Sequence, residues 1–172
     1  MWDIGQAIHN NQYIEIKYQG VLGSTVKTRK LKPLAVMFSE MYFYLAAFID
    51  DDKVRENFNV LNDSFPTIYR IDRIQGLKVL DEKFHIPCTD RFEEGEFRKR
   101  IQFMYGGKLR KVKFKYLGYS VEAVLDKLPT ARILSEELDE DGKRTIYTIS
   151  AEVFGEGIDM WLRSQGDLIE FT

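Results

Sequence analysis

The chain of 172 residues contains one cysteine, two histidines and four prolines, and these shortages exclude several kinds of site. Because Cys88 is alone, no intramolecular disulfide can form, which fits an ordinary reducing compartment. His9 and His85 are far apart in the sequence and neither has a cysteine or histidine at ligand spacing, so we expect no zinc site. No Ser-His-Asp order or paired-carboxylate pattern stands out. We therefore predict no catalytic residue, no metal and no cofactor.

The sequence also lacks a long apolar run and a strong excess of charge of one sign. No apolar stretch approaches the length that spans a bilayer. The start, Met-Trp-Asp-Ile-Gly-Gln, lacks the basic and apolar regions of a signal peptide. We therefore expect a cytoplasmic protein with no membrane partner. The net charge of −2 gives no overall attraction for nucleic acid, so phosphate binding would have to come from a local patch.

Apolar and aromatic residues are abundant, at 44% and 13% of the chain, which is enough to build a folded core. The stretch 41–48 is apolar throughout and rich in aromatics, yet too short for an amphipathic helix with turns at both ends. It therefore predicts a buried strand. Arg29 lies upstream of this strand, and Arg70 and Arg73 lie downstream. Arginines on both sides of an aromatic strand are the only chemically informative cluster in the sequence.

The first eighty or so residues predict a small all-β barrel after a short helix at 3–9. Alternation of Ile14 and Ile16 with charged residues is typical of a half-buried strand. Pro33 is expected at a strand end because proline donates no hydrogen bond to a sheet. Three adjacent carboxylates at 50–52 would repel one another in a metal site, so they predict a solvated hairpin loop. The expected strands are 13–18, 26–34, 42–48, 68–71 and 76–80.

Residues 83–108 have a different pattern, which we interpret as a helical linker between two domains. Asp90, followed by Glu93 three residues later, is typical of a helix start. Gly106 and Gly107 are expected to end the helix. Its apolar stripe would consist of residues at i, i+4 and i+7, namely Phe97, Ile101 and Met104.

Residues 109–172 predict an α+β domain with the order strand, helix, strand, strand, helix, strand, which is the ferredoxin-like βαββαβ unit. The Asp-Gly pair at 141–142 favours a hairpin turn between its second and third strands. Gly155-Glu-Gly157 lacks the other glycines of a phosphate-binding loop, so we interpret it as the start of a helix. The expected elements are 110–116, 121–128, 131–138, 145–154, the helix around Trp161, and 168–171.

Several fragments together resemble the WYL domain, the sensor module of many bacterial transcriptional regulators. Residues 14–18 resemble the first strand of the family and 29–33 its Arg-x-x-x-Pro segment. Phe43-Tyr44-Leu45 stands where the family has Trp-Tyr-Leu, and 69–74 resembles its Phe-Arg-Leu-Asp-Arg-Ile segment. The order and spacing of the fragments match as well. The resemblance covers residues 1–82, and 109–172 resembles the WCX extension that commonly follows, above all in 159–166.

The resemblance implies a mixed fold, in which an Sm-like or SH3-like barrel at 1–82 and a ferredoxin-like WCX domain at 109–172 flank the linker 83–108. It also implies a ligand sensor that acts on a DNA-binding region, with nucleic acid or a nucleotide-like effector as ligand. Carried over by position, the ligand-binding residues are Arg29, Tyr44, Arg70 and Arg73. A homodimer is expected by analogy. The chain begins almost at the WYL-like segment, so we expect the usual winged helix-turn-helix region to be absent from it.

The residues leave alternatives open at this site. Arg70 and Arg73 would lie on opposite faces of a continuous strand, so they can converge only if the chain turns at Asp72. Arg73 could instead form an ion pair with Asp72 or with the 50–52 loop, and Tyr44 could be a core residue. Phe43 and Leu45 are expected in the core. Three lysines are expected to form a solvated strand edge, with a broader phosphate patch as the alternative: Lys27, Lys30 and Lys32.

We therefore predict a non-enzymatic regulatory sensor that binds a phosphate-bearing ligand, single-stranded nucleic acid or a nucleotide, through this Arg/Tyr cluster. Arginine suits phosphate because its guanidinium holds two oxygens at once, and aromatic faces suit bases. One alternative is a dimerisation module without ligand, whose arginines form structural ion pairs. The other is a hydrolase that acts on nucleotides.

Overall fold

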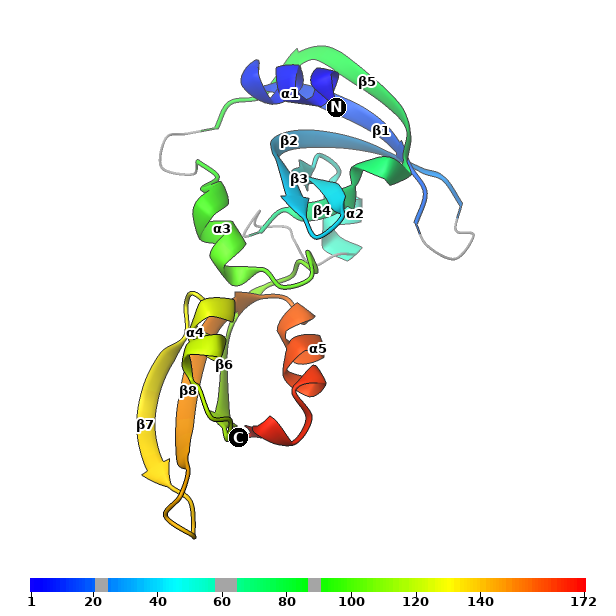
Figure 1. Cartoon of the computed structure of the whole chain (residues 1–172). Coiled ribbons are helices and arrows are strands. Elements are labelled where there is room, and N and C mark those ends of the chain that lie inside the picture. Colours follow the sequence, from blue (N-terminus) through cyan, green and yellow to red (C-terminus); the bar gives the residue numbers. More distant parts are fainter. Residues whose placement is uncertain (21–24, 58–64, 87–90) are drawn as a thin grey trace. The chain divides into compact units, whose positions relative to one another are not determined.

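A computed structural model describes residues 1–20, 25–57, 65–86 and 91–172, and the chain divides into two compact units, Met1–Glu93 and Glu94–Thr172 (Figure 1). Each unit has one antiparallel sheet and its own helices, so the fold is mixed α and β. Cys88, Asp90 and most of the segment after α2 lie outside the described residues. None of the described helices is long and apolar enough to cross a membrane.

The sheet of the first unit contains five strands in the order β4-β3-β2-β1-β5, each antiparallel to its neighbour. The strand expected at each of the five positions is confirmed, although β2 and β5 extend several residues beyond the predicted ends. The second strand continues through Pro33 to Ser39, and the pairing shifts between Pro33 and Ala35. A bulge therefore accommodates the missing N–H inside the strand. The strands are β1 (Gln12–Tyr18), β2 (Lys27–Ser39), β3 (Tyr42–Ile49), β4 (Thr67–Arg70) and β5 (Ile74–Lys83).

One face of this sheet forms the core of the first unit. Period-two alternation brings buried side chains from successive strands together, including Ile14, Leu31 and Leu45, none of which is accessible to solvent. The helix α1 (Trp2–His9) packs on β1, β2 and β5 through Ile4 and Ala7. Each fully buried aliphatic side chain stabilises such a core by about 1.5–3 kcal/mol. We call this surface of the sheet the core face.

Two expectations around β3 were wrong. Phe43 is 42% exposed and contacts Phe38 across the β2–β3 hairpin, because it is the second residue of β3 and lies close to the turn at Glu40. The acidic residues after β3 start a helix, α2 (Asp52–Asn57), in place of a hairpin loop. Asp51 accepts hydrogen bonds from the backbone N–H groups of Lys53 and Val54 at 3.0 and 3.2 Å, as a helix N-cap does.

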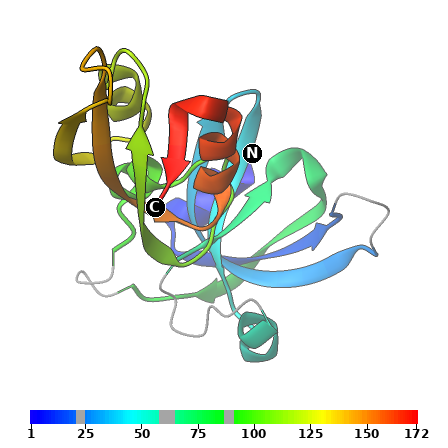
Figure 2. The ribbon, with the colours of Figure 1, turned by 90° about the horizontal axis from the view of Figure 1, so that it is seen from below.

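The second unit has four strands in the order β7-β8-β6-β9, again antiparallel throughout (Figure 2). The two helices between the strands place Val124, Leu128, Ile158 and Leu162 in one core with Phe114 and the other inward side chains. The order of elements is strand, helix, strand, strand, helix, strand, as predicted. These elements are β6 (Leu109–Tyr116), α4 (Glu122–Lys127), β7 (Arg132–Leu138), β8 (Thr145–Phe154), α5 (Gly157–Ser164) and, after a 3-10 turn η3 (Gly166–Leu168), β9 (Ile169–Phe171).

The helix expected in the linker is shorter than predicted and belongs to the second unit. It is α3 (Glu94–Arg100), with Phe97 buried against Phe154 of β8. Ile101 leaves the helix to form a parallel bridge with Phe154, and Met104 has a positive φ of 51°. The apolar stripe predicted for this helix therefore ends at Ile101. Contact between Ile101 and β8 replaces the last helical turn that the sequence predicted.

Candidate ligand-binding site

Tyr44 and Arg70 project from the same face of the sheet in the first unit. They are direct partners in the β3–β4 ladder, and the next pair along the ladder, Leu45 and Tyr69, belongs to the core face. Since successive side chains of a strand alternate, Tyr44 and Arg70 lie on the face opposite the core. Tyr44 is half-buried there.

Arg70 is held in place by two neighbours. Its Nε and Nη2 donate to Asp72 Oδ1 and Oδ2 at 3.0 and 2.6 Å, and its guanidinium lies 3.5 Å from the centroid of the Tyr42 ring. Such a bidentate pair is geometrically specific, and the aromatic face adds a cation–π contact. The hydrogen bonds from Arg70 lower the pKa of the Asp72 carboxyl. The ion pair considered for Arg73 with Asp72 is thus made by Arg70.

The chain turns at Asp72, as it must if Arg70 and Arg73 are to lie on the same side of the sheet. The residues Ile71–Arg73 form a 3-10 turn, η1, directly after β4. Burial raises the pKa of the Tyr44 hydroxyl, while the positive charges of Arg70 and Arg73 oppose that shift. Both arginines are therefore electrostatically coupled to Tyr44. No ion pair joins Arg73 to any acidic residue in the described part of the chain.

Arg29 lies elsewhere on the sheet. It pairs with Ile16 in the β1–β2 ladder, so it projects from the core face, opposite Tyr44 and Arg70. Burial raises the pKa of Tyr69, and the positive charge of Arg29 opposes that shift. The Nη1 atom of Arg29 donates a hydrogen bond to the Thr28 carbonyl at 3.1 Å. The structure thus brings Tyr44, Arg70 and Arg73 together and places Arg29 on the other face.

Sequence reasoning missed two residues of this cluster, Tyr42 and Asp72. The signal for Tyr42 was available, because it shares strand parity with Tyr44. Its contact with Arg70, however, depends on the β3–β4 register, which the sequence does not specify. We name Tyr42, Tyr44, Arg70, Asp72 and Arg73 the β3–β4 cluster.

The lysines of β2 do not extend this cluster. β2 is an inner strand, so the expected solvated edge was wrong. Lys30 Nζ lies 3.0 Å from Asp50 Oδ2, 2.7 Å from Glu82 Oε2 and 4.2 Å from the centroid of the Tyr13 ring. Hydrogen bonds to these two carboxylates raise its pKa. In the described residues, no group of His, Cys, Asp and Glu side chains has the arrangement of a metal site.

Comparison with known proteins identifies the first unit. Residues 2–79, which lie within the first unit, match the family model of the WYL domain. No curated protein sequence matches the chain. Among solved structures, the chain is similar to proteasome accessory factor B/C (PafBC) of Arthrobacter aurescens, with 19% identity and a TM-score of 0.44 over 99% of this chain. That match covers 24% of the PafBC chain, so this chain spans about a quarter of its length.

Proposed function

We propose that this chain is the ligand-sensing part of a bacterial transcriptional regulator and acts without catalysis. The observation that carries the proposal is the WYL family match over residues 2–79, because WYL domains are sensor modules of such regulators. The sensor would bind a phosphate-bearing ligand, either single-stranded nucleic acid or a nucleotide, through the β3–β4 cluster.

The geometry of the cluster supports this ligand class. Arg73 makes no ion pair with another described residue, and the nearby Asp72 carboxylate is already bound by Arg70, so its guanidinium is available for a phosphate. Tyr44 is half-buried beside it and offers a ring and a hydroxyl, which suit a base. Arg70 is held by Asp72 and Tyr42, so its part is to fix the cluster and add positive charge. Arg29 would contribute from the core face only if the ligand reached around the sheet edge.

We further propose that the first unit is an Sm/SH3-like barrel spanning 1–82 and that 109–172 is a WCX domain of ferredoxin-like fold, joined by 83–108. In support, β5 returns to pair with β1 in the first unit. In the second unit, four antiparallel strands in the order β9-β6-β8-β7 enclose one core with two helices. The protein would act as a homodimer, and ligand binding would shift its conformational equilibrium toward one state that a DNA-binding region reads.

The proposal is tested by titrating short single-stranded DNA and RNA into the chain and into variants. Arg73→Ala should weaken binding by roughly tenfold or more, since a charged hydrogen bond is lost. The control is Lys78, an exposed residue of β5, which is at the opposite end of the strand order from β4. Lys78→Ala should leave the affinity nearly unchanged. Equal affinity for all three proteins would overturn the proposed site, and no binding at low salt would overturn the nucleic-acid ligand.

A second function, a structural dimerisation module, is favoured by one observation. Arg70 is satisfied by Asp72 and Tyr42 without any ligand. If that module is the whole function, Arg70→Ala and Asp72→Ala will lower the melting temperature or the dimer fraction, while Arg73→Ala changes neither stability nor binding. Thermal unfolding and sedimentation of the same variants separate the two functions.

A further inference from the structure

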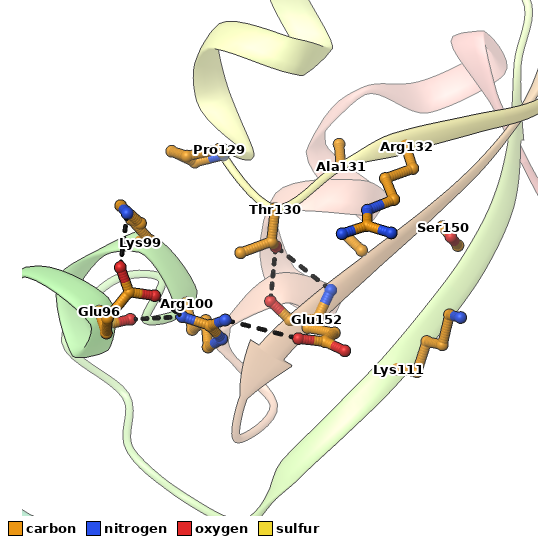
Figure 3. Close-up of a pocket in the computed structure, with 11 residues that line it drawn as sticks. Glu96, Lys99, Arg100, Lys111, Pro129, Thr130, Ala131, Arg132, Ser150 and Glu152 are labelled. Carbon is orange, nitrogen blue, oxygen red and sulfur yellow. Dashed lines mark hydrogen bonds and ion pairs between the residues drawn. The ribbon is translucent and has the colours of Figure 1, made fainter.

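We propose that a polar pocket in the second unit is a separate binding site for a small phosphomonoester. The pocket has a volume of about 290 Å³ and lies wholly within residues 94–172. Ligand pockets in proteins have volumes from about 300 Å³ upward, so this one suits a small molecule. Figure 3 shows its lining, in which α3 provides Glu96, Lys99 and Arg100, and the sheet provides Lys111, Arg132, Ser150 and Glu152.

The charge of the pocket wall is unbalanced. Its lining contains four cationic and two anionic side chains. Glu96 binds Lys99 and Arg100 at 2.6 and 2.7 Å, and Arg100 also lies 3.5 Å from Glu152. These hydrogen bonds lower the pKa of Glu96, so it stays ionised, and Glu96 and Glu152 together balance the charges of Lys99 and Arg100. The excess of two positive charges therefore belongs to the other side of the pocket, where Lys111 and Arg132 lie.

Lys111 and Arg132 come from strands on either side of β8 and belong to one face of the sheet. Lys111 pairs with Glu152, and Arg132 pairs with Ser150, which lies two residues before Glu152 on β8. Both cations are exposed, and neither has an ion-pair partner among the residues that the structure describes. The opposite face carries the core with Phe114 and Ile149. The two cations thus form an open pair beside the pocket.

Ser150 supplies the second observation that indicates a ligand. It is only 3% exposed, lines the pocket between the strands of the two cations, and its hydroxyl makes no hydrogen bond to another described residue. A serine hydroxyl that has no protein partner on the wall of a pocket can donate a hydrogen bond to a bound ligand. The Thr130 hydroxyl, by contrast, is satisfied, since it donates to the Glu152 carbonyl at 2.7 Å and accepts from the Glu152 N–H. Ser150 is therefore the donor that a bound anion would engage.

A phosphomonoester matches these groups. At pH 7 it carries a charge of about −1.5 to −2 and three acceptor oxygens, which complements two cations and one hydroxyl. The guanidinium of Arg132 can hold two of those oxygens, and Lys111 acts as a point charge. This site is independent of the β3–β4 cluster, because every residue that lines it belongs to the second unit.

The test is calorimetric titration of the full chain with AMP and inorganic phosphate as probes and adenosine as the uncharged control. We expect AMP and phosphate to bind and adenosine not to bind. Arg132→Ala and Lys111→Ala should each weaken AMP binding by about tenfold or more. The matched control is Lys143→Ala, which removes an exposed cation of the turn between β7 and β8, outside the pocket.

A gain of affinity provides a result that misfolding cannot imitate. Glu152→Gln removes the carboxylate near Arg100 while keeping the backbone bonds to Thr130, so AMP should bind several times more tightly. Lowering the pH below about 6 protonates the phosphomonoester and should weaken AMP binding, whereas binding of sulfate, which keeps its charge, should persist. These titrations are made in an Arg73→Ala background, which removes nucleotide binding at the proposed β3–β4 cluster. AMP affinity that Arg132→Ala leaves unchanged in that background would overturn the site.

Discussion

At the scale of single residues, neighbours in β3 have opposite environments. Leu45 is inaccessible to solvent, whereas Phe43 is 42% exposed, although the sequence predicted both in the core. Strand parity places these two residues on the same face. The difference arises because the core ends before the hairpin tip, where Phe43 packs against the exposed ring of Phe38. Hydrophobicity alone therefore did not locate the edge of the core.

We expect Leu45→Ala to lower the free energy of unfolding by about 2–5 kcal/mol, because it leaves a cavity in a closed core. Phe43→Ala should lower it by roughly 1 kcal/mol, since much of its ring already contacts water. Urea unfolding of both variants measures the two values. Equal losses would contradict the burial that distinguishes these residues.

The Arg70–Asp72 pair predicts a pH-dependent stability. The pKa of Asp72 is lowered in the folded chain, so its ionised form stabilises the fold at a pH above the unfolded value of about 3.9. That stabilisation is lost as the pH falls through the lower folded pKa. Asp72→Asn should therefore reduce the melting temperature at pH 7, and the difference from wild type should shrink in strong acid. A difference that is the same at both pH values would show that the ion pair is not its cause.

At the scale of elements, local periodicity was sufficient where each strand has one buried face. The alternation in 13–18 and 110–116 predicted β1 and β6 within a residue or two. Local periodicity gave the wrong boundary where the end of an element depends on its pairing partner. β2 passes through Pro33 because β3 continues to pair with it beyond a bulge, and α3 stops at Arg100 because Ile101 bridges to Phe154. Neither partner could be identified from the local sequence.

Two features of the turn before α5 require glycine at position 155, so adding one methyl group there should lower the stability strongly. Gly155 has φ of 68°, and a Cβ there would lie 2.5 Å from the Gly106 carbonyl oxygen. Gly155→Ala should therefore destabilise the second unit by more than the roughly 1–2 kcal/mol that a positive φ alone costs.

Gly142 is the matched control for this substitution. Its φ is 66°, but a Cβ there would meet nothing within 4 Å, so Gly142→Ala should cost only the conformational part. Thermal unfolding of the two variants gives the comparison. If both lose the same stability, the close approach of Gly155 to the chain at Gly106 is not rigid.

At the scale of the whole molecule, each unit has its own core cluster, with no residue in common. The aromatic strand and the arginines around it could be read from the sequence, and the family resemblance assigned four of those residues to ligand binding. Their distribution over two faces could not be predicted, since it depends on the ladder registers that pair Tyr44 with Arg70 and Ile16 with Arg29.

Separate cores predict that damage to one unit leaves the other folded. Trp161 packs against the core of the second unit, and Trp2 lies in the first, so a Trp2→Phe background leaves Trp161 as a reporter of the second unit alone. In that background, Leu45→Ala should lower the unfolding midpoint measured by circular dichroism at strand wavelengths, while the Trp161 fluorescence midpoint stays in place. A parallel shift of both midpoints would mean that the chain unfolds as one cooperative unit.

We propose that the first unit binds phosphate through the β3–β4 cluster, and the salt dependence of oligonucleotide binding is the sharpest test of this site. The slope of the logarithm of the affinity against the logarithm of salt concentration changes by about 0.7 for each phosphate contact to a single strand. We predict that Arg73→Ala makes the slope shallower by roughly this amount, whereas Lys78→Ala leaves it unchanged. A slope that is the same in wild type and Arg73→Ala would contradict the claim, because Arg73 would then make no contact with phosphate.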